Sequence, residues 1–139
     1  MINMIYIKSE ELKKMINQAK EEFSNECCGF LSGIKDEEDI HIYKIYPLTN
    51  IDKSSEHFSM DPKEQFSAVK AIRNDGKELI GNYHSHPYTP SRPSEEDKRL
   101  AYDTKALYGI LSLEKEEPVF NLFSINKDKE VEKLQYKID

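Results

Sequence analysis

Two histidines separated by one residue, His84 and His86, have the residue type and spacing best suited to chemistry in this chain. They stand at the end of an apolar run that predicts a β-strand, and strand side chains alternate between the two faces. Both imidazoles therefore point to the same side and can reach one metal ion. Asp97, in the pattern Ser94-x-x-Asp97 that predicts a helix start, can bring a carboxylate back to that ion.

Two histidines and one carboxylate leave the fourth position of a zinc ion open to water, which is typical of a catalytic zinc site. Each half of the pattern also has a plainer interpretation. The histidines could be core or surface residues, and Asp97 could serve only as part of a helix-capping box. The joint pattern over residues 84–97 favours the metal site, because the two halves together are far less likely to arise by chance than either half alone.

Composition limits the class of protein. The chain has 139 residues, the size of one ordinary domain, with 37% hydrophobic and 33% charged residues. These values fit a globular domain rather than a disordered or fibrous chain. The formal net charge is -6, without the clustered basic face that binding to phosphate backbones requires. Nucleic acid is therefore not an expected partner.

Compartment is indicated by the cysteines and by the apolar segments. Cys27 and Cys28 are adjacent and cannot readily bridge each other, which favours a reducing compartment. The apolar start at residues 1–7 is too short for a signal peptide, and no window approaches the roughly 20 apolar residues of a membrane span. We expect a cytoplasmic protein that does not cross a membrane.

Alternation and helical spacing predict a mixed sheet flanked by two or three helices, an α/β or α+β sandwich. One helix carries an apolar stripe from Leu12 to Phe23 with Ser9 as its N-cap, a second begins at Asp61-Pro62, and a third covers 95–102. The predicted strands cover 4–7, 26–34, 40–46, 56–60, 79–85, 107–113, 119–125 and 131–138.

The stretch from His84 to Asp97 resembles the metal-binding motif of the JAMM metalloprotease family, the MPN+ domains. That motif is His-x-His-Pro followed by Ser-x-x-Asp, with a glutamate upstream. The upstream residue corresponds to Glu26, because 26–31 is similar to the Glu-x-Cys-Gly-hydrophobic start of small bacterial members. Glu21 and Glu22 lie nearby, but Glu26 alone immediately precedes the predicted strand.

The resemblance covers nearly the whole chain. It implies a single JAMM/MPN+ domain over residues 1–139, with a cytidine-deaminase-like α-β-α sandwich and a mixed β-sheet. It also implies that His84, His86 and Asp97 hold Zn²⁺. Glu26 would be the general base, and Ser94 would donate its hydroxyl to the oxyanion or serve only as an N-cap.

Three classes of function compete. The resemblance implies a zinc isopeptidase or peptidase that cleaves after the C-terminal Gly-Gly of a ubiquitin-like or sulfur-carrier protein. A non-catalytic MPN-type scaffold would be expected to lack one or more of the motif residues, and none is lacking. A nucleoside deaminase would call for Pro-Cys-x-x-Cys, which the chain does not contain. A DNA-associated relative shares the motif, but this chain is acidic and shows no DNA-binding module ahead of it.

Five other side chains have plainer interpretations than a role in the metal site. Cys28 is expected to pack in the core, and no spacing ties His41 or His57 to the site. Tyr83 and Tyr88 flank the histidines and could either shape a substrate groove or pack.

Overall fold

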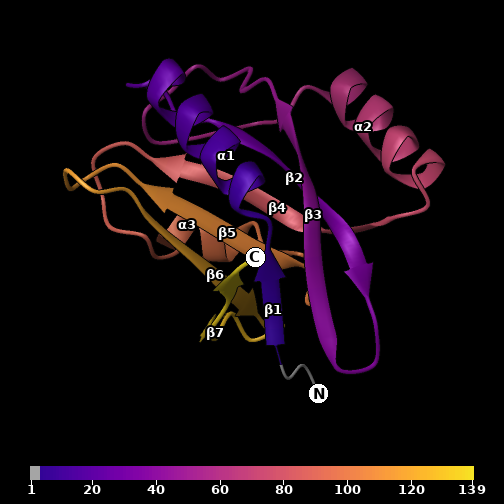
Figure 1. The fold of residues 1–139 in the computed structure, drawn as a ribbon. Coiled ribbons are helices and arrows are strands. Elements are labelled where there is room, and N and C mark those ends of the chain that lie inside the picture. Colours follow the sequence, from indigo (N-terminus) through magenta and orange to yellow (C-terminus); the bar gives the residue numbers. More distant parts are fainter. Residues whose placement is uncertain (1–3) are drawn as a thin grey trace.

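The computed structural model describes residues 4–139, which form one eight-stranded sheet with three helices (Figure 1). The strands are β1 (Met4–Ile7), β2 (Cys28–Lys35), β3 (Asp39–Leu48), β4 (Glu78–His86), β5 (Leu107–Ser112), β6 (Val119–Ile125), β7 (Val131–Leu134) and β8 (Lys137–Ile138), and the helices are α1 (Ser9–Glu22), α2 (Pro62–Asn74) and α3 (Glu95–Arg99). No helix within these residues is long and apolar enough to cross a membrane.

The sheet has the strand order β7-β6-β5-β4-β2-β3-β1-β8. Strand β1 runs parallel to β3 and β8, and β4 runs parallel to β5, while the other neighbours are antiparallel. This confirms the predicted mixed sheet. The single strand predicted over 131–138 is wrong, because β7 and β8 lie at opposite ends of the strand order. So short a connection between opposite edges requires the sheet to curl strongly, as Figure 1 shows.

Helix α1 covers one face of the sheet. Its stripe of Leu12, Met15 and Ala19 is buried in a cluster with apolar side chains of the sheet, as the spacing predicts. The predicted N-cap is wrong, because the helix already includes Ser9 and the cap position falls on Lys8, which makes no side-chain capping bond. Ser9 is therefore the first residue of the helix.

Tyr83 also belongs to the α1 face. Its hydroxyl donates to Gln18 Oε1 at 2.6 Å, and the amide of Gln18 donates to the carbonyl of Cys28 at 3.0 Å. The ring is fully buried and packs in the core rather than shaping a groove.

Helix α2 packs on the second face through Ala68 and Ile72, against a cluster that includes Cys28 and Phe30 of β2. The predicted core position of Cys28 is confirmed. The start of α2 is also as predicted, because the Asp61 carboxylate accepts hydrogen bonds from two backbone amides of the first turn.

Strand β4 lies at the centre of the sheet, between β2 and β5. A Cβ on Gly81 would collide with the backbone of Leu107, so glycine allows β5 to approach closely at this point. From Gly81 onward the side chains alternate, which sets Asn82, His84 and His86 on the face opposite Tyr83.

Two local expectations differ from the structure. Residues 56–60 form a loop rather than a strand, with one isolated bridge between Asn50 and Met60. Helix α3 ends at Arg99, shorter than predicted, because Leu100 is already its C-cap. The loop between β3 and α2 nevertheless reaches the candidate site.

Candidate metal centre

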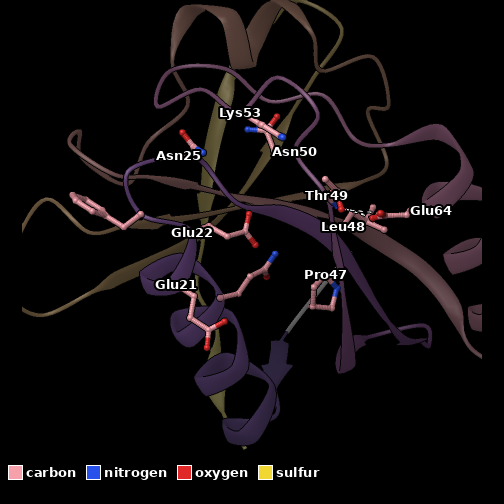
Figure 2. A pocket seen from close by; sticks show the side chains of 11 residues that line it. Glu21, Glu22, Asn25, Pro47, Leu48, Thr49, Asn50, Lys53 and Glu64 are labelled. Atoms are coloured by element: carbon pink, nitrogen blue, oxygen red, sulfur yellow. Dashed lines mark hydrogen bonds between the residues drawn. The ribbon is translucent and has the colours of Figure 1, made fainter.

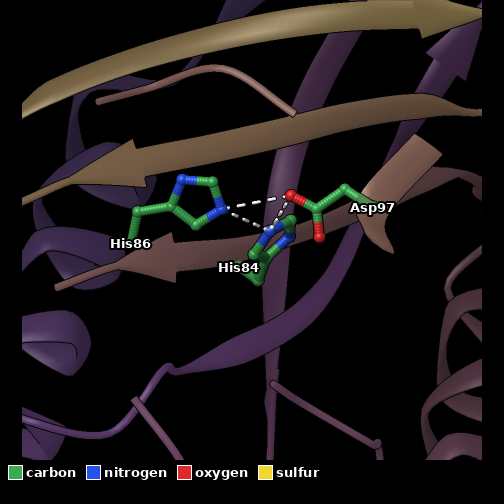
Figure 3. Close-up of side chains that lie close together, drawn as sticks. All are labelled: His84, His86 and Asp97. Carbon is green, nitrogen blue, oxygen red and sulfur yellow. Dashed lines mark hydrogen bonds and ion pairs between the residues drawn. The ribbon is translucent and has the colours of Figure 1, made fainter. Parts of the chain in front are cut away.

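Three ligand atoms converge where β4 ends and α3 begins. The Nε2 atoms of His84 and His86 lie 3.1 Å apart, and each lies 3.1 Å from Asp97 Oδ2 (Figure 3). Both histidines are 4% exposed. The structure thus brings the three predicted ligands together in a geometry that could hold one metal ion.

The donor set of His86 fits a cation. Its Nδ1 lies 2.9 Å from the carbonyl of Pro90, an acceptor, so Nδ1 must carry the ring proton. In the neutral ring Nε2 is then an acceptor, yet it lies 3.1 Å from Asp97 Oδ2, a second acceptor, and 3.1 Å from His84 Nε2. Such atoms approach closely when a proton or a metal ion lies between them. The residues present therefore fit a bound metal.

His84 is oriented differently. Its Nδ1 is buried and makes no hydrogen bond to any part of the chain within residues 4–139. The ring is instead stacked on Phe58, with centroids 4.5 Å apart and an interplanar angle of 23°. Packing from the loop before α2 thus fixes the direction of its Nε2.

Charge in the cluster is set by Asp97. Burial alone would raise the pKa of this carboxyl, but hydrogen bonding to His84 and His86 outweighs burial and holds the pKa well below its usual range. For His86, burial opposes protonation, but its interactions with Asp97 and Pro90 raise the pKa. The cluster therefore presents an ionised carboxylate, which is a good ligand for a cation.

Ser94 and Asp97 also form the capping box of α3. Ser94 Oγ accepts from the backbone amide of Asp97 at 3.0 Å, and Asp97 Oδ2 accepts from the amide of Ser94 at 2.9 Å. The same Oδ2 atom faces both histidines, so the cap aims the carboxylate at the cluster. Ser94 accepts in this bond, so its hydroxyl proton stays available for donation.

Glu26 lies beside the cluster, on the segment that leads into β2. Cys28 pairs with His84, and continuing this antiparallel register by two residues sets Glu26 opposite His86. The pairing does continue, because the amide of Ser85 donates to the carbonyl of Cys27 at 3.0 Å. Glu26 is 4% exposed.

Burial raises the pKa of the Glu26 carboxyl to about 8. The positive charge of His86 lowers it in part, and the negative charge of Asp97 raises it further. A carboxyl that titrates near neutral pH can both accept and return a proton under ordinary conditions.

The other two glutamates considered, Glu21 and Glu22, lie elsewhere. They line a groove of ≈ 550 Å³ between the end of α1 and the segment from Pro47 to Lys53 (Figure 2). None of the three candidate ligands lines this groove. Of the three glutamates, only Glu26 lies in the segment that continues the pairing of β2 with β4 beside His86. Its assignment as the general base stays a prediction.

Sequence reasoning missed two residues of the loop that precedes α2. Phe58 stacks on His84, and the buried Asn50 donates to the carbonyl of Glu26 at 3.0 Å. Neither has a sequence signal, because one acts through packing and the other through backbone atoms. His57 is exposed, as expected for a residue that is not a ligand, and its Nδ1 lies 2.7 Å from Glu96 Oε1.

The curled mixed sheet thus carries a His-His-Asp cluster that could hold a metal ion, beside a buried glutamate. Residues 8–125 match the model of a family described as prokaryotic homologs of the JAB domain. The chain belongs to this family, which confirms the resemblance seen in the motif.

The chain is similar in sequence to known peptidases and in structure to a solved protein. The chain is 28% identical over 113 residues to a CysO-cysteine peptidase of Mycobacterium bovis, which is 80% of this chain and 75% of the relative. It is 32% identical over 88 residues to a desampylase of Haloferax volcanii, covering 63% and 62% of the two chains. The solution structure of a Desulfitobacterium hafniense protein superposes with a TM-score of 0.87 at 46% identity, over 97% of this chain and 92% of the other.

Proposed function

We propose that the protein is a zinc-dependent isopeptidase or peptidase. Its substrate would be the amide bond that follows the C-terminal Gly-Gly of a ubiquitin-like or sulfur-carrier protein. The observation that carries the proposal is the buried Glu26 beside the converging atoms of His84, His86 and Asp97. The peptidase and desampylase relatives support it.

His84 Nε2, His86 Nε2 and Asp97 Oδ2 would hold the metal. A bound zinc ion supplies acidity to water and polarises a carbonyl group. The protein fixes the ligands: the carbonyl of Pro90 orients His86, and the capping box orients Asp97. Ligands held in this way by their own hydrogen bonds need not reorganise when the metal binds.

Glu26 moves the proton. Its carboxylate would accept a proton from the attacking water and then deliver it to the nitrogen of the leaving amine. A pKa of about 8, raised by burial, suits both steps. The oxyanion that develops on the carbonyl would accept a hydrogen bond from the Ser94 hydroxyl, while Ser94 Oγ continues to cap α3.

The proposed substrate is supported by chemistry as well as by the relatives. A Gly-Gly tail has no side chains, so it can enter a narrow site and pair its backbone with neighbouring strands. The chain carries two free buried cysteines, which is consistent with our expectation of a reducing cytoplasm. Its net charge of -6 does not favour a nucleic-acid partner.

The test is hydrolysis of a carrier protein whose Gly-Gly terminus is joined to one amino acid. The zinc-loaded wild type should release the amino acid, and Glu26→Gln should retain zinc but react about 10²- to 10⁴-fold more slowly. Glu22→Gln is the matched control, because Glu22 lines the separate groove, and it should keep wild-type activity. Carrier binding without release by a folded, zinc-loaded wild type would instead support a non-catalytic scaffold.

A further inference from the structure

A small cavity opens beside the His84 ring, between the sheet and α3. Its floor is formed by Asn82 and His84 of β4, which pair with Tyr108 and Ile110 of β5. The other side chains that line it come from the loop before α2 and from the segment around α3: Phe58, Pro93, Glu96, Asp97 and Leu100. We call this cavity the β4–α3 slot.

The lining of the β4–α3 slot is mostly apolar. Phe58, Pro93, Leu100 and Ile110 supply hydrocarbon surface, whereas the carboxylate of Glu96 supplies a negative charge at one side. That carboxylate is fixed by the side chain of His57 at 2.7 Å. The apolar lining therefore favours an apolar side chain, and the negative charge disfavours an acidic one.

Two candidate metal ligands, His84 and Asp97, line the slot themselves. An occupant must consequently lie within about one residue of the bond that reacts. On the acyl side of the proposed scissile bond the residue is glycine, which has no side chain to fill a cavity. Only the residue on the leaving side can place a side chain there.

We propose that the β4–α3 slot binds the side chain of the leaving amino acid and so sets the specificity of the enzyme; this inference rests on the proposed function. The slot measures ≈ 80 Å³, several times the roughly 10–15 Å³ that one water requires. It therefore accepts an uncharged side chain of a few non-hydrogen atoms, such as that of alanine, cysteine or valine. A tryptophan side chain is too large, and a glutamate side chain meets the charge of Glu96.

The experiment uses carrier adducts that end in Gly-Gly-X, with X as glycine, valine, glutamate or tryptophan. With the zinc-loaded wild type, kcat/KM for valine should exceed that for glycine by about 10-fold or more, because filling an apolar pocket strengthens transition-state binding. Glutamate and tryptophan should react more slowly than valine by a similar factor. Equal kcat/KM values for all four adducts would overturn the slot while leaving the proposed function in place.

A matched pair of variants locates the effect. Leu100 lines the slot and Leu79 does not, and both are 46% exposed, so either leucine can be replaced by alanine with little risk to folding. Leu100→Ala should reduce the ratio of kcat/KM for the valine adduct to that for the glycine adduct several-fold and should raise kcat/KM for the tryptophan adduct. Leu79→Ala should behave as wild type. If Leu100→Ala lowers kcat/KM by the same factor for every adduct, the proposal is overturned.

Binding separates the slot from the reaction. Zinc-loaded Glu26→Gln should bind the valine adduct more tightly than the glycine adduct in calorimetry, and Leu100→Ala added to it should remove that difference. If the wild type cleaves no adduct, the proposed function fails. Tighter binding of the valine adduct than of the glycine adduct would still support the slot. Binding that does not depend on X would overturn it.

Discussion

The side-chain amide of Asn50 donates a hydrogen bond of 3.0 Å to the main-chain carbonyl of Glu26. The same amide donates to the carbonyl of His57, and the Asn50 oxygen accepts from the backbone amides of Asp52 and Ser59. One buried side chain thus closes the loop before α2 and joins it to the segment that carries the proposed base. Asn50 is a positioning residue for Glu26.

Asn50→Ala is expected to lower kcat more than it changes KM. It leaves buried backbone groups without partners, so the free energy of unfolding should fall by about 1–3 kcal/mol. A looser Glu26 carboxyl becomes better hydrated, which lowers its pKa, so the acidic limb of the pH–kcat profile should move to lower pH. Steady-state kinetics across pH measure both effects.

Ser59→Ala is the control for this loop. The Ser59 hydroxyl donates to Asp52 at 2.8 Å on the exposed side and does not contact Glu26. Its kinetics should match wild type. If Asn50→Ala lowers stability but leaves the pH profile in place, Asn50 has only a structural role.

Removal of one candidate ligand should abolish metal binding. His84→Ala takes away one of three converging nitrogen and oxygen atoms, and two remaining ligands hold zinc poorly. Zinc added to the wild type should raise its melting temperature, because a ligand that binds only the folded state stabilises it. The variant should show neither stoichiometric zinc by elemental analysis nor this rise.

His41→Ala provides the comparison. His41 lies on β3, where its ring stacks between those of Tyr6 and Tyr43, and β3 is not a neighbour of β4 in the sheet. His41 also belongs to a group with Asp36 and Asp39 whose ligand atoms could hold a cation. His41→Ala should therefore keep one zinc at the His84–His86–Asp97 centre and lose only zinc bound at that second group. Full zinc occupancy in His84→Ala would contradict the assignment of the centre.

The metal-free protein should become less stable as pH rises through neutrality. Burial raises the pKa of Glu26 from 4.5 to about 8 in the folded state, so the folded protein holds this proton more tightly than the unfolded chain. The resulting stabilisation is complete below about pH 4.5 and is lost as pH rises through 8. His86, whose pKa is also raised, contributes in the same direction.

Urea titrations of wild type and Glu26→Gln isolate the contribution of Glu26. The variant lacks the ionisable group, so its stability should fall less between pH 5 and 9, by on the order of a few kcal/mol at most. Asp97, whose pKa is lowered, remains ionised throughout this range and adds no slope. If the free energy of unfolding changes with pH in the same way in both proteins, the pKa of Glu26 is not raised by burial.

Local patterns in the sequence predicted most of the helices and strands and singled out the three candidate ligands. His84 and His86 share a face because strand side chains alternate, and Asp97 is placed by its capping box with Ser94; both rules act over a few residues. Family resemblance added Glu26, whose position opposite His86 depends on pairing between distant strands.

Other features depend on tertiary contacts that no local pattern encodes. Residues 131–138 read as one strand, but they divide between the two edges because the whole sheet curls. Asn50 bonds only to backbone atoms in the loop and at Glu26, and Phe58 meets His84 only after the loop folds over β4. A side chain that bonds to backbone atoms, or that packs against a distant ring, has no characteristic spacing in the sequence by which it could be predicted.

Ser94 can be tested for its two roles separately, because capping needs only an acceptor or a permissive backbone, while oxyanion stabilisation needs a hydroxyl proton. Ser94→Gly should cost only a few tenths of a kcal/mol of stability, since glycine is tolerated at an N-cap. Its kcat should nevertheless fall about 10²- to 10³-fold, the usual loss when one oxyanion donor is removed. Ser94→Thr retains the hydroxyl and should recover most of the activity. Equal activity of the glycine and threonine variants, at matched zinc content, would leave Ser94 with the capping role alone.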